Sequence, residues 1–340
     1  MKRRGYRIVS LVAGVLLLSS LIASCGKAEQ SDETRTLAGL AQRAGLREND
    51  TLLDKTDVFT AGDSISDWVA FGVAGSGRAD RGADYLAALK EYVSNEYVQN
   101  GGLDAIKSTE WHRISLAILA LGGNPLAFGT DCAGNAINLI ADGTYAFDGE
   151  IVLQGTNGPI FALITLDAGV YDVPDGSRYT RESLRDMILA AQSESGAFGL
   201  SRGADNVDIT GMALCALAPY TDIAEVQTAV DAAVDYLSRQ QSPYGDYLYN
   251  GDRSSESVSQ IIIGLCALGI DPESDSRFMK SGISLYEALF RFRNEDGSFR
   301  HLVDKQEGSD IMATEQALRA LLAVRKLRNG GGSIYDFSGN

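Results

Sequence analysis

The residue types best suited to chemistry are few and scattered in this sequence. Its only histidines are His112 and His301, and no cysteine stands near either. Cys132, Cys215 and Cys266 are too widely spaced for a zinc cluster or a disulfide framework. No serine–histidine–aspartate arrangement, phosphate-binding glycine loop or metal-spaced carboxylate set stands out. We therefore assign no catalytic residue, no metal and no cofactor from these residues.

A second group of polar residues stands where apolar helices begin. Acidic and small polar side chains there cap free N–H groups and complement the helix dipole. If the helices run parallel in a ring, their first turns meet at one mouth, together with aromatic residues of the preceding turns. Aromatic groups beside a few convergent polar groups are typical of a binding site. The residues expected at this mouth are Trp68, Glu110, Trp111, His112, Asn157, Phe198, Asp208, Tyr247, Glu256, Gln260, Phe299 and Glu315.

A plainer interpretation of the same residues stays open. The acids would then only cap helices, and the aromatic side chains would only fill space between repeats. His112 and His301 would be hydrogen-bonding residues at the edge of the ring rather than catalytic bases. If the mouth does bind a ligand, its carboxylates oppose an anion and favour amides, hydroxyls or positive charge.

The elements that would position these residues repeat about every fifty residues. Turns of the form Gly-x-aromatic recur at intervals of 49 to 53 residues. Each is followed by a polar stretch and an apolar run such as 261–268, and a helix that is apolar nearly all round is buried. Between these runs lie amphipathic segments such as 224–241. The turns begin at Gly143, Gly196, Gly245 and Gly297.

Six buried helices alternating with amphipathic ones predict an all-α fold. We expect an (α/α)6 toroid of six inner and about six outer helices over residues 55–328. An open solenoid would need polar capping repeats at both ends, and none is clear. Residues 329–340 are expected to be a disordered tail, and they include the run Gly330-Gly331-Gly332.

The N-terminus has the pattern of an export signal. Basic residues at 2–4 and 7 precede the uncharged apolar run 8–22, which predicts a signal peptide over residues 1–24. Leu21-Ile22-Ala23-Ser24-Cys25 resembles the bacterial lipobox, which implies that Cys25 is acylated and anchors the protein to the cell membrane outside the cytoplasm. An ordinary signal peptide cut nearby is the alternative. The polar stretch 25–54 is expected to be an acylated, flexible tether with a short helix at Leu37–Leu46.

The chain is strongly acidic. Its formal net charge is −15, and loss of the four basic residues of the leader brings the mature chain near −19. Nucleic acid phosphates repel such a surface, so we exclude nucleic acid as a partner.

Several segments resemble a known family. Tyr236 to Tyr247 fits aromatic-aliphatic-x3-Gln-x3-Gly-x-aromatic, which resembles the repeat of triterpene cyclases and protein prenyltransferase β subunits. Segments 157–163, 208–214 and 312–318 look like the prenyltransferase/squalene-oxidase-repeat proteins of bacterial surfaces. The resemblance covers residues 55 to 328 and implies the toroid of the terpenoid cyclase/protein prenyltransferase superfamily. It does not imply one function, because a fold hosts unrelated activities.

The chemistries that the resemblance implies fit this chain poorly. Hopene-type cyclases protonate an alkene with an Asp-x-Asp-Asp motif, and only the acid position, Asp208, is kept in 206–209. A lone aspartate that opens a helix is more often a cap. Prenyltransferases bind zinc through Asp, Cys and His, for which the histidines here are too few. Thioester domains carry a reactive cysteine where this chain has Ala313.

The leading hypothesis is therefore a binding protein. Cobalamin carriers share the toroid and bind a corrinoid at its mouth against a second β domain, which a partner protein would have to supply here. We expect an exported, lipid-anchored protein that holds a small molecule, such as a corrinoid, or a partner peptide. The competing classes are an isoprenoid-converting enzyme with Asp208 as its acid, and a structural wall-interaction module.

Overall fold

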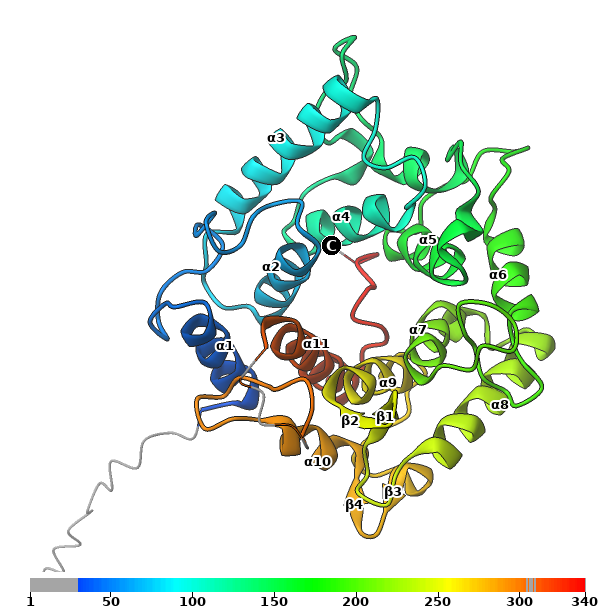
Figure 1. Ribbon diagram of the computed structural model, residues 1–340. Helices are drawn as coiled ribbons and strands as arrows, with labels where there is room; N and C mark the ends of the chain where they lie inside the picture. Colours follow the sequence, from blue (N-terminus) through cyan, green and yellow to red (C-terminus); the bar gives the residue numbers. More distant parts are fainter. Residues whose placement is uncertain (1–29, 304, 306–307, 309, 340) are drawn as a thin grey trace, which may run out of the picture. The chain divides into compact units, whose positions relative to one another are not determined.

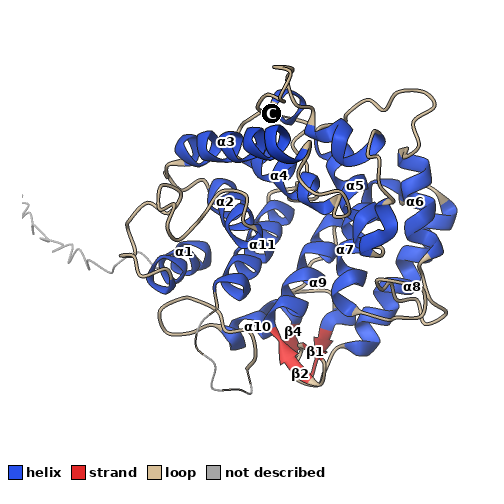
Figure 2. Cartoon of the chain, turned by 45° about the horizontal axis from the view of Figure 1, so that its top comes forward, coloured by secondary structure: helices blue, strands red, loops and turns tan. Residues whose placement is uncertain are grey.

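The computed structural model describes residues 30–303, 305, 308 and 310–339. The expected signal peptide and Cys25 lie outside these residues. From Ser31 onward the chain forms one compact unit, whose regular structure is mostly helical (Figures 1 and 2). None of the helices described is long and apolar enough to cross a membrane.

Six helices form the predicted inner ring, and each contacts the next until the sixth returns to the first (Figure 1). They are apolar on most sides because neighbours and the lumen surround them. Their order is α2 (Ser64–Ser76), α4 (Thr109–Ala120), α5 (Asn157–Ala168), α7 (Val207–Leu217), α9 (Ser255–Ala267) and α11 (Ile311–Arg328). The all-α toroid is confirmed.

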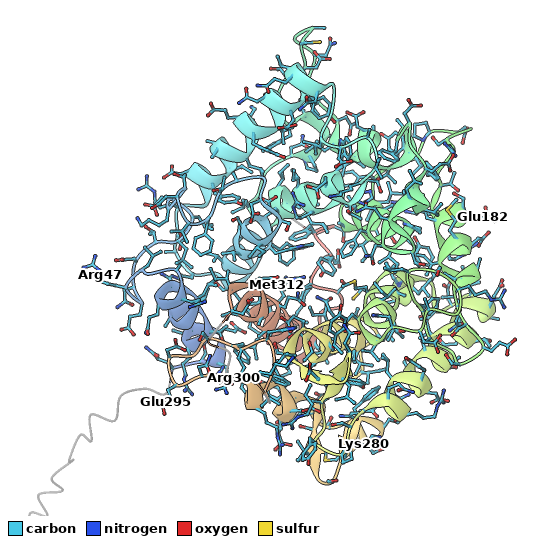
Figure 3. All side chains as sticks on the ribbon, viewed as in Figure 1. Arg47, Glu182, Lys280, Glu295, Arg300 and Met312 are labelled. Carbon is cyan, nitrogen blue, oxygen red and sulfur yellow. The ribbon has the colours of Figure 1, made fainter. Side chains whose placement is uncertain are left out.

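The outer ring consists mainly of amphipathic helices, whose charged faces lie on the outer circumference, as Glu182 does in Figure 3. One position holds only a short π-helical turn, Ala141–Tyr145. Two short antiparallel hairpins, β1–β2 and β3–β4, accompany α9 and α10. The other elements are α1 (Asp32–Arg43), α3 (Gly82–Asn100), α6 (Arg181–Ala190), α8 (Ala224–Gln240), α10 (Leu285–Leu289), β1 (Tyr247–Tyr249), β2 (Asp252–Ser254), β3 (Met279–Lys280) and β4 (Ile283–Ser284).

The first turns of the inner helices lie at one end of the ring. Arg113 in the second turn of α4 donates to Asp67 in the first turn of α2, with Nε 3.0 Å from Oδ2. Gln260 of α9 donates to Gln316 of α11 at 2.8 Å, again between early turns. Because an outer element returns the chain after each inner helix, the inner helices run parallel and share one mouth.

Helices α7 and α9 approach each other more closely than side chains normally allow. A Cβ added to Gly264 would lie 2.4 Å from the carbonyl oxygen of Gly211. A Cβ added to Gly211 would lie 2.8 Å from the carbonyl oxygen of Gln260. The two glycines therefore set the separation of these helices, which carry Asp208 and Glu256 at their starts.

The expected tether is wrong for residues 31–54, which belong to the body. Helix α1 packs against α11 as the sixth outer helix and buries Leu37 and Leu40. A Cβ added to Gly39 would lie 2.1 Å from the backbone nitrogen of Ser298, so α1 rests directly on that turn. The short helix expected at 37–46 begins earlier and spans Asp32–Arg43, and its apolar residues fall on one face, which packs against the body.

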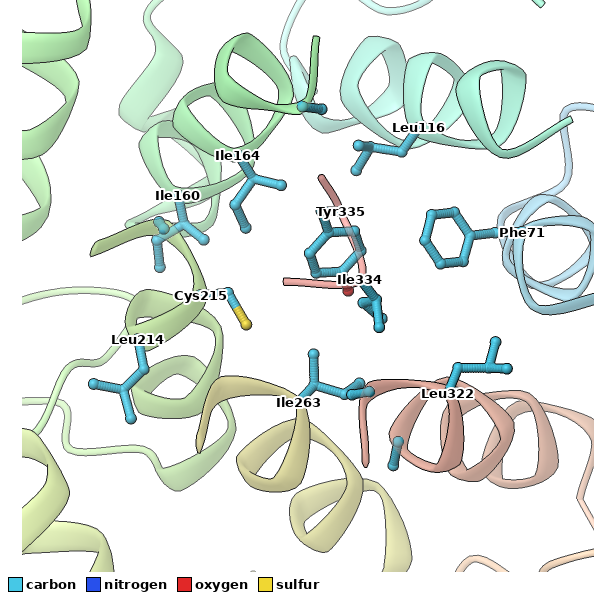
Figure 4. Packing of buried hydrophobic residues seen from close by; sticks show 14 of the residues in the cluster. Phe71, Leu116, Ile160, Ile164, Leu214, Cys215, Ile263, Leu322, Ile334 and Tyr335 are labelled. Carbon is cyan, nitrogen blue, oxygen red and sulfur yellow. The ribbon is translucent and has the colours of Figure 1, made fainter. Parts of the chain in front are cut away.

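The expected disordered tail is wrong as well. After α11 the chain folds back into the ring, and the red segment lies in its centre (Figure 1). Ile334 and Tyr335 are buried among inner-helix side chains such as Phe71, Ile164 and Leu322 (Figure 4). The glycines allow the reversal, and the two apolar side chains hold the segment by burial.

Candidate functional site

Four predicted mouth residues gather at the first two turns of α7, α9 and α11: Asp208, Glu256, Gln260 and Glu315. Gln260 reaches Gln316 on α11, as described above. Burial is the main cause that raises the pKa of Asp208 and of Glu315. Glu256 lies close enough to both carboxyls to raise their pKa further. The mouth is therefore a crowded acidic site on this side of the ring.

Glu256 is the central residue of this site. Its side chain is only 9% exposed, and Oε2 lies 2.7 Å from Nδ1 of His301. The hydroxyls of Ser254 and Ser255 donate to the same oxygen at 3.0 and 3.2 Å. The other oxygen, Oε1, is buried and has no hydrogen-bond partner among the residues described.

Local backbone structure holds this group in place. Ser254 at the end of β2 caps α9, because its hydroxyl accepts from the backbone N–H of Ser257 at 3.4 Å. The N–H of Ser255 donates to the carbonyl of His301 at 3.1 Å. The hairpin before α9 and the loop before α11 thus join to present one carboxylate.

Asp208 does not cap its helix, contrary to the expectation for a lone aspartate at a helix start. Asn206 is the cap, since its Oδ1 accepts from the N–H of Ile209 at 2.9 Å. Oδ1 of Asp208 is buried without a partner among the described residues. Burial raises the pKa of Asp208, and the neighbouring Glu256 raises that pKa further. The Ser257 hydroxyl and His301 lower it in part, although the hydroxyl is outside hydrogen-bonding geometry.

Asn157, at the start of α5, adds a third oxygen of this kind. Its Oδ1 is also buried and unpartnered within the part of the chain that the structure describes. Amide oxygens and ionised carboxylates can only accept hydrogen bonds. Three successive inner helices, α5, α7 and α9, therefore each present an unsatisfied acceptor near their N-termini: Asn157, Asp208 and Glu256.

An ion pair lies in the lumen beneath the mouth. Glu315 and Arg319 are buried, with Oε2 2.7 Å from Nε. The Arg319 guanidinium lies over the ring of Trp68, 4.4 Å from its centroid. Trp68 in turn lies 6.1 Å from Phe161 and 6.3 Å from Tyr335 between ring centroids. Trp68 is thus a lumen residue. Sequence reasoning missed Arg319, whose signal was an acid and a base four residues apart on an apolar helix.

Trp111 and His112 do not lie at the mouth, contrary to prediction. Nε1 of Trp111 donates to the hydroxyl of Tyr97 on the outer helix α3 at 2.8 Å. Nε2 of His112 lies 2.7 Å from the carbonyl oxygen of Gly143 in the outer ring. Burial lowers the pKa of His112 to about 4. Both side chains fasten α4 to the outer ring because the rotation of α4 turns them away from the lumen.

The remaining predicted residues are structural. Phe198, Tyr247 and Phe299, from the repeat turns, have no exposed surface, so they fill space between repeats as the plainer interpretation held. Glu110 forms an ion pair with Arg113, with Oε2 2.7 Å from Nη2, and supports the contact between α2 and α4. The three aromatic side chains are therefore not available to a ligand.

Three cavities among the residues described lie apart from this acidic cluster. One of about 650 Å³ lies outside the ring beside Trp111 and Phe147. Two of about 380 and 370 Å³ lie at the other end of the lumen, on either side of the C-terminal segment. Among the residues described, no group of His, Cys, Asp or Glu could hold a metal ion.

Comparison with known proteins bears on the fold. No family model matches the sequence, and a search of curated proteins finds no match either. Several solved structures are similar. An ent-copalyl diphosphate synthase from Streptomyces platensis is 18% identical, with a TM-score of 0.50 over 80% of this chain and 51% of that chain. A type II terpene cyclase from Scytonema is 13% identical, with a TM-score of 0.50 over 87% and 97%.

The third is protein geranylgeranyltransferase-I from Candida albicans, 12% identical with a TM-score of 0.52 over 87% of this chain and 91% of that chain. The shared fold is an α/α toroid, and unsaturated glucuronyl hydrolase from Bacillus sp. GL1 is similar to the same degree, 12% identical with a TM-score of 0.52 over 91% of this chain and 98% of that chain. At these identities the likeness extends to the fold alone. The chain also spans only about half the length of the copalyl diphosphate synthase, and the toroid by itself selects no reaction.

Proposed function

We propose that this protein is an exported, lipid-anchored binding protein whose mouth holds a ligand rich in hydrogen-bond donors. The observation that carries the proposal is the set of three buried acceptors on Asn157, Asp208 and Glu256, which lack donors among the residues described. A buried acceptor without a partner costs about 1–3 kcal/mol. A ligand that supplies N–H or O–H groups removes this cost, and binding is favoured accordingly.

The lumen favours binding over cyclisation of an isoprenoid. A cyclase needs an open apolar cavity deep in the ring to fold its substrate and stabilise carbocations. Here Trp68, Phe161 and the buried Arg319 fill that position. Amides, hydroxyls and ammonium groups at the mouth need no such cavity.

The ligand class follows from the acceptors. A corrinoid carries primary amides around its ring, and each supplies N–H donors, so it is the first small molecule to test. A partner peptide with a lysine or a free N-terminus would present the same donors. In a lipid-anchored protein, acylated Cys25 would hold this mouth at the outer face of the cell membrane.

Calorimetry and thermal shift with cobalamin and cobinamide test the proposal. We expect binding by the wild-type chain and at least tenfold weaker binding by Glu256→Gln, about 1.4 kcal/mol. The matched control is Glu225→Gln, an exposed glutamate on α8, which should bind like the wild type. If neither corrinoid binds the wild type, the corrinoid proposal fails.

A second candidate, an enzyme with Asp208 as its acid, rests on the raised pKa of that carboxyl. A carboxyl that stays protonated can donate a proton to an alkene. Incubation with squalene separates the two functions. If the wild type forms a product and Asp208→Asn does not, the protein is an enzyme and the binding assignment is wrong. If squalene stays unchanged, the hypothesis of an enzyme acting on squalene fails.

A further inference from the structure

The C-terminal segment 330–338 fills the lumen at the end opposite the mouth (Figures 1 and 4). We propose that this segment is a displaceable plug, and that the lumen it occupies is a second binding site for a neutral aromatic or polycyclic molecule bearing one oxygen. This site is separate from the acidic mouth and does not depend on the function proposed for it.

Few interactions hold the plug. Oη of Tyr335 lies 3.3 Å from Nη1 of Arg319, and the N–H of Phe337 donates to the carbonyl of Ala168 at 2.8 Å. Lys326 donates to the carbonyl of Asp336 at 3.0 Å. The rest is burial of Ile334 and ring contacts of Tyr335 and Phe337. A segment held this way can open locally without unfolding the helices around it.

The plug is also loosely packed. The cavity of about 380 Å³ on one side is lined by Ile164, Cys215 and Ala267. The cavity of about 370 Å³ on the other side is lined by Phe71 and Leu322. Of this segment only Ile334 and Tyr335 are buried, and the spaces on both flanks are open to solvent, so the rest of the segment contacts the ring on few sides. Departure of the plug would join the two spaces into one cavity of the size that small ligands occupy.

The hinge for this movement is the glycine run after α11. Gly330 has φ +79°, and the N–H of Gly331 donates to the carbonyl of Lys326 at 2.9 Å. These glycines close the C-terminus of α11 by themselves, which is their usual role at helix ends. The helix therefore keeps its cap when residues 333–338 leave the lumen.

The side chain that the plug inserts indicates the ligand. The ring of Tyr335 packs against both Trp68 and Phe71, with centroids 6.3 and 5.6 Å away. Its hydroxyl meets Arg319, whose charge Glu315 already balances. An occupant of this place needs an aromatic face and one oxygen that accepts from Arg319, and it needs no charge.

The decisive test uses the wild-type chain and 1-naphthol as the probe, with naphthalene as its oxygen-free counterpart. If the ligand replaces the plug, saturating 1-naphthol should speed hydrogen exchange of peptides covering 333–338 at least tenfold and leave α9 unchanged. Naphthalene should bind several-fold more weakly, because Arg319 gains no acceptor. Unchanged exchange in the tail, or exchange in the free protein as slow as in α9, would overturn the proposal.

Cys215 supplies a second readout through its thiol. It lines the cavity beside Tyr335, and burial raises its pKa to about 12, which keeps it unreactive. In a Cys132→Ser background, Tyr335→Ala should raise the labelling rate of Cys215 at least tenfold, and 1-naphthol should slow it again. The apparent affinity for 1-naphthol should rise with the open fraction.

Two controls accompany the labelling. Tyr244→Ala changes an exposed tyrosine in the same way and should leave the rate unaltered. Cys266, which is buried in α9, should stay unlabelled in each variant. A folded Tyr335→Ala chain with an unreactive Cys215 would contradict the displaceable plug. Labelling of Cys266 would mean that the variant unfolds globally, and the hydrogen-exchange experiment on the wild-type chain then decides.

Discussion

Buried charge is handled in two ways at the level of the residue. Asp67 has a full set of partners, because Arg113, the hydroxyl of Tyr85 and the N–H of Gly62 all donate to it. Asp208 and Glu256 each keep an oxygen that nothing described satisfies. Folding alone favours the first arrangement. Groups of the second kind are typical of functional sites, where stability is lowered for the sake of binding.

Replacing Asp208 with asparagine should therefore stabilise the free protein at neutral pH. Burial raises the pKa of Asp208, so the folded state disfavours its ionised form, and wild-type stability falls as the pH rises from about 4 through the folded pKa. Asp208→Asn removes this loss. Urea unfolding should show the variant more stable at pH 8 and equal to the wild type near pH 3. A variant that is less stable at pH 8 would contradict the assignment.

His112 should give a pH dependence of the opposite sign. Its folded pKa of about 4 lies below the ordinary 6.5, so stability is complete above pH 6.5 and is lost as the pH falls toward 4. The loss should approach about 3 kcal/mol by pH 4. His112→Gln, which can still donate to Gly143, should flatten this part of the profile. Unfolding of both proteins between pH 7.5 and 4.5 checks it.

At the level of the element, the spacing between helices depends on single glycines. Gly264→Ala places a methyl group against the backbone of α7, which cannot move aside, and should cost about 1–3 kcal/mol or more. Gly75→Ala is the matched control, because its Cβ meets only the tip of Leu322 at 3.0 Å. Thermal unfolding should show a clearly larger loss for Gly264→Ala. Equal losses would mean that α7 and α9 are less close than described.

At the level of the whole molecule, the two ends of the chain complete the ring together. Helix α1 supplies the outer partner of α11, and Asp32 joins Arg293, with Oδ1 2.6 Å from Nη1. Arg325 near the end of α11 contacts both Glu33 and the carbonyl of Gly75. The chain thus closes without exposed terminal repeats, which is why the polar caps of a solenoid are unnecessary.

Leu40→Ala tests this closure. The side chain is fully buried, and its loss should cost about 2–5 kcal/mol. A flexible tether would instead tolerate the change without effect. Gln42→Ala, on the exposed face of the same helix, is the control and should change the unfolding free energy by less than about 0.5 kcal/mol. An unaffected Leu40→Ala chain would place α1 outside the body.

The sequence alone determined the number, type and order of the inner helices. Hydrophobic periodicity and Gly-x-aromatic turns are local properties that survive any arrangement of the elements, so the toroid was predictable from them. It also identified Asp208, Glu256 and Gln260, because a residue in the first turn of a parallel inner helix must lie near the mouth.

Only the tertiary structure decided which way each side chain points and what fills the ring. Trp68 and Trp111 occupy equivalent places at helix starts, yet one enters the lumen and the other packs against α3. That choice depends on the rotation of each helix about its axis, which packing against its neighbours sets. The docking of α1 and of Tyr335 likewise depends on surfaces that exist only once the ring has formed, and no local pattern encodes them.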